Sequence, residues 1–309
     1  MADSNHEEQL QFSIAKALLY SDIFSYPLTA EEIFRRLTTN HTCVEEVKKM
    51  LSAMKDDGIV FQFGNFFSIR NEQTLERRRT TGNQKASVVL PAALRRGRFL
   101  GKFPFIRAVM ISGSLSKNYM ENGSDVDYFV ITRPGRLWLA RFFFALFKRV
   151  FLFNSHKHFC VNYYLSEDNL EIEEKNIFTA TELTSLIPVC GNQFVQLMMS
   201  NSWVRDYFPN MENGSGKVVL DAPFPIWKKL IESVINPLGD RLDHWIMNYA
   251  IQRYRRRYAH AFSQKDFDIA FKSKRGVSKS HNLNYQKRVT ELYNSKVEGF
   301  VQDRRIAVP

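Results

Sequence analysis

Two short apolar runs in the first half of the chain constrain its fold most. Residues 106–112 (IRAVMIS) and 125–132 (DVDYFVIT) are rich in β-branched and aromatic side chains, and each is bounded by turn residues. We therefore expect both to be β-strands. Gly113-Ser114 follows the first run directly and predicts a tight turn into a short helix, and residues 122–124 (NGS) predict a loop before the second run.

The second run begins with an Asp-x-Asp pattern that predicts a metal site. Side chains alternate along a strand, so Asp125 and Asp127 project from the same face about 7 Å apart. Such a pair suits Mg²⁺, which binds a few carboxylate oxygens together with waters and phosphates. The Gly113-Ser114 turn offers backbone N–H groups and a hydroxyl to phosphate oxygens, and Lys117, one turn later, adds a positive charge.

This stretch, VMISGSLSKNYMENGSDVDYFVIT, resembles the signature of the nucleotidyltransferase superfamily that includes DNA polymerase beta. The family pattern is an apolar strand, Gly-Ser, a spacer of about this length and Asp-x-Asp between apolar residues. It matches at Gly113, Ser114, Asp125 and Asp127, and Ser124 also fits. The resemblance covers residues 105–175.

The resemblance implies a metal-dependent transferase. The two aspartates would hold Mg²⁺ or Mn²⁺, and the Gly-Ser turn would grip the phosphates of a nucleoside triphosphate, with ATP favoured. A nucleoside monophosphate would pass to an acceptor hydroxyl with release of pyrophosphate. The acceptor, whether a small molecule, an RNA or a protein, stays open.

Active members of the family usually carry a third carboxylate on a later strand. The strand expected over 158–166 offers Asn162 at that position, and an amide can ligate a metal but cannot accept a proton. Glu171, on a short strand expected over 170–172, is the possible substitute, whereas Glu182 is expected in an exposed helix cap and less readily at the active site. Two alternatives to a general transferase follow: a catalytically degenerate nucleotide-binding regulator, and a toxin–antitoxin-type modifier of a protein hydroxyl.

The first 75 residues have the order of a winged helix-turn-helix. Helices are expected over 9–20 and 29–37 and from Thr42 to Gly58, the last two opened by capping boxes. Strands are expected over 59–63 and 66–69. The third helix carries four acidic residues against three lysines, so we favour a structural or protein-binding role over DNA reading.

The remaining chain completes an expected α+β architecture. We expect a basic, helical connector over 76–104, a mixed-sheet nucleotidyltransferase-like core over 105–176, a helical region over 177–261 and a basic tail over 262–309. The tail is the segment least expected to be ordered. Within the helical region, we expect helices over 180–187, 193–207, 225–235 and 238–261.

Basic residues accumulate toward the C-terminus. The net charge is +11, and residues 253–309 contain 14 Lys and Arg against 5 Asp and Glu. Such a segment fits a nucleic-acid contact, and the tyrosines interleaved among Arg253, Arg255, Arg256 and Arg257 would add stacking surface to it. A solvated face is the commoner outcome for such a run of arginines.

Membrane insertion and export are not expected. The most apolar run, 137–153, is interrupted by Arg141, Lys148 and Arg149, so it predicts a buried or amphipathic helix, with a membrane-surface helix as the weaker alternative. The N-terminus does not have the pattern of a signal peptide, and the three cysteines have no disulfide or zinc spacing. We therefore expect a cytoplasmic protein.

Overall fold

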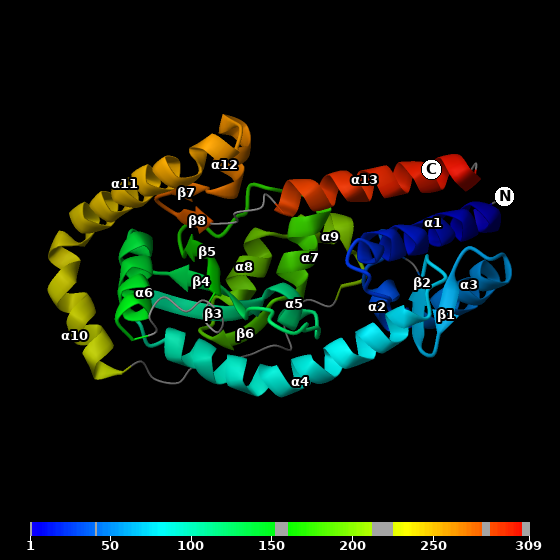
Figure 1. Ribbon diagram of the computed structural model, residues 1–309, viewed down its shortest axis with the longest axis horizontal. Helices are drawn as coiled ribbons and strands as arrows, with labels where there is room; N and C mark the ends of the chain where they lie inside the picture. Colours follow the sequence, from blue (N-terminus) through cyan, green and yellow to red (C-terminus); the bar gives the residue numbers. More distant parts are fainter. Residues whose placement is uncertain (1, 41, 152–159, 212–224, 280–284, 305–309) are drawn as a thin grey trace.

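The computed structural model describes residues 2–40, 42–151, 160–211, 225–279 and 285–304. It has the expected mixture of helices and strands: a two-stranded hairpin near the N-terminus and a six-stranded mixed sheet whose strands lie between residues 106 and 279, both flanked by helices (Figure 1).

The N-terminal unit consists of three helices followed by the hairpin. Helices α1 (Ala2–Asp22), α2 (Ala30–Phe34) and α3 (Val44–Asp56) precede strands β1 (Phe61–Phe63) and β2 (Phe66–Ser68). Thr29 caps α2 in the expected capping box. The third helix differs slightly from expectation, because Cys43 rather than Thr42 is its N-cap: Glu46 accepts a hydrogen bond from the Cys43 N–H at 3.2 Å.

Helix α4 (Thr74–Leu100) is the expected helical connector, and it runs along both the N-terminal unit and the sheet (Figure 1). Its basic residues are not all solvated. Arg79 is buried, donates to the Pro27 carbonyl at 2.8 Å and to Glu32 at 2.7 Å, and lies over the Tyr26 ring. This arginine therefore fastens the connector to the N-terminal unit.

The central sheet has the strand order β6-β3-β4-β5-β8-β7. Strands β3 (Ile106–Ser112) and β4 (Asp127–Thr132) are antiparallel, and β4 and β5 (Cys160–Ser166) are parallel. β6 (Ile187–Cys190) forms one edge; β7 (Ser273–Lys274) and β8 (Val277–Lys279) form the other. Residues 170–172 were expected to form a strand but form no regular element. The helix expected over 180–187 covers 177–185 instead, and Ile187 is the first residue of β6.

Helices cover both faces of this sheet. Helices α4 and α6 (Leu137–Phe151) pack on one face around buried Tyr128 and Trp138. The other face is covered by α7 (Ile177–Ser185), α8 (Phe194–Ser200) and α9 (Val204–Tyr207) around Phe129. The single helix expected over 193–207 is thus two, broken at buried Asn201, whose side chain bonds to backbone groups of residues 170, 172 and 197.

The C-terminal third contains the two expected helices over 225–261 and, in the tail, regular elements that were not expected. Helices α10 (Ile226–Ile235) and α11 (Gly239–Tyr258) form an arc at the end of the molecule opposite to both termini (Figure 1), joined by a 3₁₀ turn (Asn236–Leu238). A second 3₁₀ turn (Ala259–Ala261) precedes α12 (Gln264–Ala270), and α13 (Tyr285–Arg304) lies beside α1. The expectation of a poorly ordered tail is therefore wrong for 264–279 and 285–304, which complete the sheet and cover the N-terminal unit.

Candidate functional site

The turn after β3 brings Gly113 against the start of β4. Ser112 and Asp127 are partners in the antiparallel register, and Gly113, the first residue of the short helix α5 (Gly113–Ser116), has a φ of +69°. A Cβ at this position would overlap the Asp127 carboxylate. Only glycine therefore permits both the left-handed backbone and the close approach of that carboxylate.

Asp127 is the centre of the site and is largely buried on the α7 side of the sheet. Its Oδ1 accepts a hydrogen bond from Asn162 Nδ2 at 2.7 Å, and Cys160 Sγ donates to Asn162 Oδ1 at 3.1 Å. Burial raises the pKa of Asp127 to about 6, with further increases from the charges of Glu182 and Asp125. The Cys160 thiol and the Lys117 ammonium act in the opposite direction.

Asp125 lies in a different environment from Asp127. Strand β4 begins at Asp127, two residues later than expected, so Asp125 belongs to the preceding loop and its side chain is exposed. The alternation argument therefore does not apply to this pair along a regular strand. The two carboxylates still interact electrostatically, because the Asp125 charge contributes to the raised pKa of Asp127.

The hydroxyl groups of Ser114 and Ser124 hold the loop between the two motif halves. Ser114 Oγ donates to Met120 Sδ at 3.6 Å, and Ser124 Oγ accepts from the Glu121 N–H at 3.3 Å. Both serines of the motif thus have partners within the loop, and neither side chain bonds to Asp127 among the described residues.

Lys117 and Glu182 form an ion pair next to Gly113. Lys117 Nζ donates to the Gly113 carbonyl at 3.0 Å and to Glu182 at 2.8 Å. Glu182 is therefore the additional carboxylate near Asp127, against the expectation of an exposed cap. Glu171, the expected substitute, is exposed and pairs with Lys175 at 2.7 Å, so it takes no part in the site.

The sequence contained one signal for Glu182. It immediately precedes buried Leu183 and comes three residues after buried Thr179, so it borders the face of α7 that packs on the sheet. The sequence does not show, however, that this face of α7 lies opposite Asp127, because that depends on the tertiary structure.

A cavity of about 110 Å³ opens beside Asp127. Phe129 and Tyr163 on adjacent strands stack in its wall, with ring centroids 5.0 Å apart. The other lining residues come from the β3–α5 turn, β5, the loop before α7, α7 and the residue after it, β8 and α13: Ser112 and Gly113; Asn162; Ile172 and Glu174; Phe178, Thr179, Glu182, Leu183 and Leu186; Lys279; and Gln286. Glu174 Oε1 accepts from Lys272, whereas its buried Oε2 has no hydrogen-bond partner within the described part of the chain.

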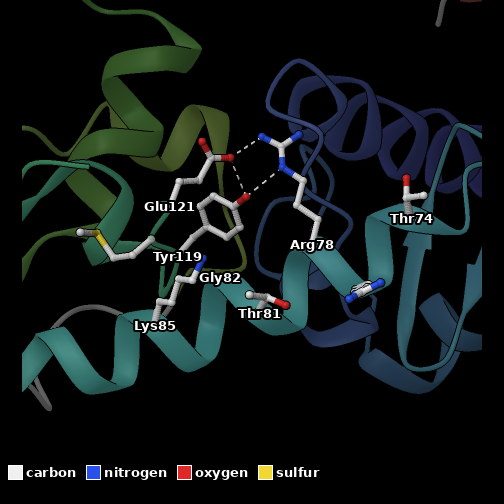
Figure 2. Close-up of a pocket in the computed structure, with 9 residues that line it drawn as sticks. Thr74, Arg78, Thr81, Gly82, Lys85, Tyr119 and Glu121 are labelled. Atoms are coloured by element: carbon white, nitrogen blue, oxygen red, sulfur yellow. Dashed lines mark hydrogen bonds and ion pairs between the residues drawn. The ribbon is translucent and has the colours of Figure 1, made fainter. Parts of the chain in front are cut away.

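A second hollow, of about 310 Å³, lies on the outer side of the motif loop, where residues 119–121 meet α4. Figure 2 shows Arg78 reaching across it to Tyr119 and Glu121, at 2.9 and 2.5 Å. The Met120 N–H donates to the Gly82 carbonyl at 3.1 Å, and a Cβ on Gly82 would overlap the Tyr119 ring. Helix α4 thereby fixes the loop that connects the two halves of the motif.

The donor set around Asp127 fits a hard divalent cation. Asp125 and Asp127 supply carboxylates, and Mg²⁺ commonly takes one or two protein carboxylates and keeps several waters. Asn162 turns its amide nitrogen toward Asp127 and its oxygen toward Cys160, so it would ligate a cation only with its amide reversed. Burial and neighbouring acids disfavour the ionised form of Asp127, and a bound cation would reverse this. Among the described residues, no group of three or more His, Cys, Asp or Glu side chains is arranged to hold a metal by itself.

Comparison with known proteins assigns no family. No family model, no curated protein and no solved structure matches this chain. Of the helices in the described ranges, none combines the length and the apolarity that crossing a bilayer requires.

Proposed function

We propose that the protein is a metal-dependent nucleotidyltransferase. One observation carries the proposal: the carboxylate of Asp127 packs directly against Gly113, and Asn162 on the neighbouring strand donates to it. Gly113, Asp127 and Asn162, to which the resemblance would give the turn, the second aspartate and the third position, are separate in sequence but lie together at one end of strands β3, β4 and β5.

The residues have distinct proposed roles. Asp125, Asp127 and Asn162 would hold Mg²⁺ or Mn²⁺, which when bound offsets charge that develops on a transferring phosphoryl group. Gly113 and Ser114 would present backbone N–H groups to the phosphates of ATP or another nucleoside triphosphate, with Ser124 in the loop beside them. Lys117, next to Gly113, reduces the net negative charge that the phosphates would meet.

The cavity beside Asp127 is the proposed place for the acceptor hydroxyl. Its small volume and its stacked Phe129–Tyr163 wall suit a compact group with an apolar body. Glu182 lines the cavity and pairs with Lys117. We propose that it takes the part of the third carboxylate that the resemblance leads us to expect.

A specific observation also favours the alternative, a nucleotide-binding regulator without turnover. Asn162 occupies the third position, its amide is already bonded to Asp127, and an amide cannot take the proton of an acceptor hydroxyl. In this alternative the N-terminal unit would respond to nucleotide. Its three helices and hairpin support the predicted winged helix, and the exposed acids Glu45 and Asp56 on α3 favour a protein partner over DNA.

The test is transfer of label from each of the four α-³²P-labelled nucleoside triphosphates in a cell extract with Mg²⁺. The wild type is compared with Asp127→Asn and with a matched control, Asp56→Asn, which removes an exposed carboxylate from α3. Label transferred by the wild type and the control, but not by Asp127→Asn, supports the transferase. Mg²⁺-dependent nucleotide binding without transfer supports the regulator, and absence of both refutes the site.

A further inference from the structure

Helix α10 is docked with two charged residues, Lys228 and Glu232, inward and several large apolar residues outward. Lys228 is 1% exposed, and its Nζ donates to the carbonyls of Gly101 and Ile106 at 2.8 and 2.6 Å. Glu232 is also buried; it accepts from the Phe105 N–H at 2.6 Å and pairs with the Arg107 guanidinium at 2.8 Å. These bonds fix the rotation of α10 about its axis.

The opposite face of α10 consists of large apolar side chains in solvent. Ile226, Leu230 and Val234, at successive i, i+4 positions, are 86%, 64% and 72% exposed, and Trp227 flanks them. Half a turn of rotation would bury these side chains and return the two charges to water, which the hydrophobic effect favours. Because the buried bonds impose the reverse orientation, the outward face is suited to contact another apolar phase.

The apolar face continues along α11. Leu238, Leu242, Trp245 and Tyr249 follow Val234 at spacings of three or four residues, and all are exposed; Trp245 and Tyr249 stack with centroids 6.1 Å apart. The opposite face of α11 packs against the rest of the protein: Asp243 accepts a hydrogen bond from the Leu139 N–H at 2.8 Å, and Ile246 packs on the core. Exposed apolar side chains thus follow one another along both helices of the arc at this end of the molecule (Figure 1), and we call this set, from Ile226 to Tyr249, the α10–α11 stripe.

Cations border this stripe and extend it. Arg253 and Arg256 come four and seven residues after Tyr249, on the same helical face, and both are exposed. Lys229 and Arg241 lie along its sides and are also exposed. Within 225–258, by contrast, Asp240 is the one exposed acidic residue, and it pairs with Arg136 and Arg275.

We propose that the α10–α11 stripe binds the surface of an anionic lipid bilayer, with its aliphatic and aromatic side chains at the headgroup boundary and its arginines and lysine against lipid phosphates. An amphipathic surface with Trp and Leu on one side and Lys or Arg around it has this behaviour. A nucleic acid would match the arginines but would leave the exposed Ile226, Leu230 and Val234 without an apolar partner, so the apolar face favours lipid.

The experiment is co-sedimentation of the full chain with vesicles of phosphatidylcholine alone and of phosphatidylcholine with about one third phosphatidylglycerol. We expect binding to the anionic vesicles that weakens as salt rises. Leu230→Glu/Trp245→Glu should lose at least about tenfold in partitioning, and Arg253→Gln/Arg256→Gln should lose about tenfold or more on anionic vesicles only. Val88→Glu, at an apolar position on α4 that is 78% exposed, is the control and should bind like the wild type.

Each other outcome overturns the proposal. All substituted side chains point into solvent, so circular dichroism and thermal unfolding of the variants should match those of the wild type. If folded wild type ignores anionic vesicles, or if Leu230→Glu/Trp245→Glu binds them equally well, the stripe is not a membrane surface. Light scattering that shows a wild-type dimer broken by the same substitutions, without vesicle binding, would assign the stripe to a second copy. Retention of the wild type by RNA or DNA but not by lipid would assign the arginines to nucleic acid.

Discussion

Replacing Asp127 by Asn should stabilise the metal-free protein at neutral pH. The carboxyl group of Asp127 has an ordinary pKa of 3.8, and burial together with the charges of Glu182 and Asp125 raises it to about 6 in the folded chain. Each pKa unit corresponds to about 1.4 kcal/mol, so ionised Asp127 costs about 3 kcal/mol of folding free energy before screening at the cavity mouth. With that screening we expect about 1.5–3 kcal/mol. The variant keeps a side-chain oxygen that can accept the bond from Asn162.

The stabilisation by Asp127→Asn should depend on pH in a definite direction. A carboxyl group with a raised folded-state pKa binds a proton more tightly in the folded chain than in the unfolded one. Its effect is therefore absent below about pH 4, develops as the pH rises from about 4 to about 6, and is constant above that. The gain in stability of Asp127→Asn over the wild type should follow the same curve, near zero at pH 4 and complete at pH 7.

The assay is denaturant unfolding of both proteins at a series of pH values in EDTA, repeated with Mg²⁺. Mg²⁺ should stabilise the wild type at pH 7 and leave Asp127→Asn unchanged, because a ligand that binds only the folded state adds to its stability. Asp56→Asn, at an exposed position, serves as the control for loss of charge alone. An Asp127→Asn variant that is less stable than the wild type at pH 7, or a difference independent of pH, would refute the account of this carboxylate.

Three further substitutions test the surroundings of the site. Gly113→Ala should lose activity and about 1–3 kcal/mol of stability, because a left-handed φ and overlap with Asp127 both oppose a Cβ; combining it with Asp127→Ala should recover part of the stability measured by thermal unfolding. Gly82→Ala should displace the Tyr119 ring and increase hydrogen exchange in the motif loop, and Tyr119→Ala should suppress the effect. Asn201→Ala should cost about 2–4 kcal/mol in denaturant unfolding, because it leaves buried backbone groups without their partners.

Elements that are specified by their own residues could be predicted from the local sequence. The β3 strand, the turn at Gly113 and most of β4 follow from apolar alternation and turn chemistry, and the capping box at Thr29 follows from side chains three residues apart. Asn162 follows from its place on the next strand, and the structure brings it to Asp127.

Elements that exist through distant pairing could not be found in this way. Strand β6 has four residues and contains a proline, and it is a strand because it pairs with β3 at the sheet edge. Strand β8 pairs with β5 more than a hundred residues earlier, so its basic local sequence read as a tail. The two-residue error at Asp125 has a similar origin, since the partner β3 ends opposite Asp127 and leaves Asp125 without a strand to pair with.

The difference between transferase and regulator depends on where the proton of an acceptor hydroxyl would go. Asn162 cannot take it, and Asp125 is exposed outside the cavity lining. Asp127 has a pKa closer to neutrality than an ordinary carboxyl group and would be the better base, but a carboxylate that holds a metal is no longer free to accept a proton. Two other carboxylates line the cavity, Glu174 and Glu182, and Glu182 is the one whose charge acts on Asp127. Its ion pair with Lys117 would have to loosen when substrate phosphates attract that lysine. A transferase built on this site therefore requires nucleotide binding to release Glu182, whereas a regulator requires only that the pair persist.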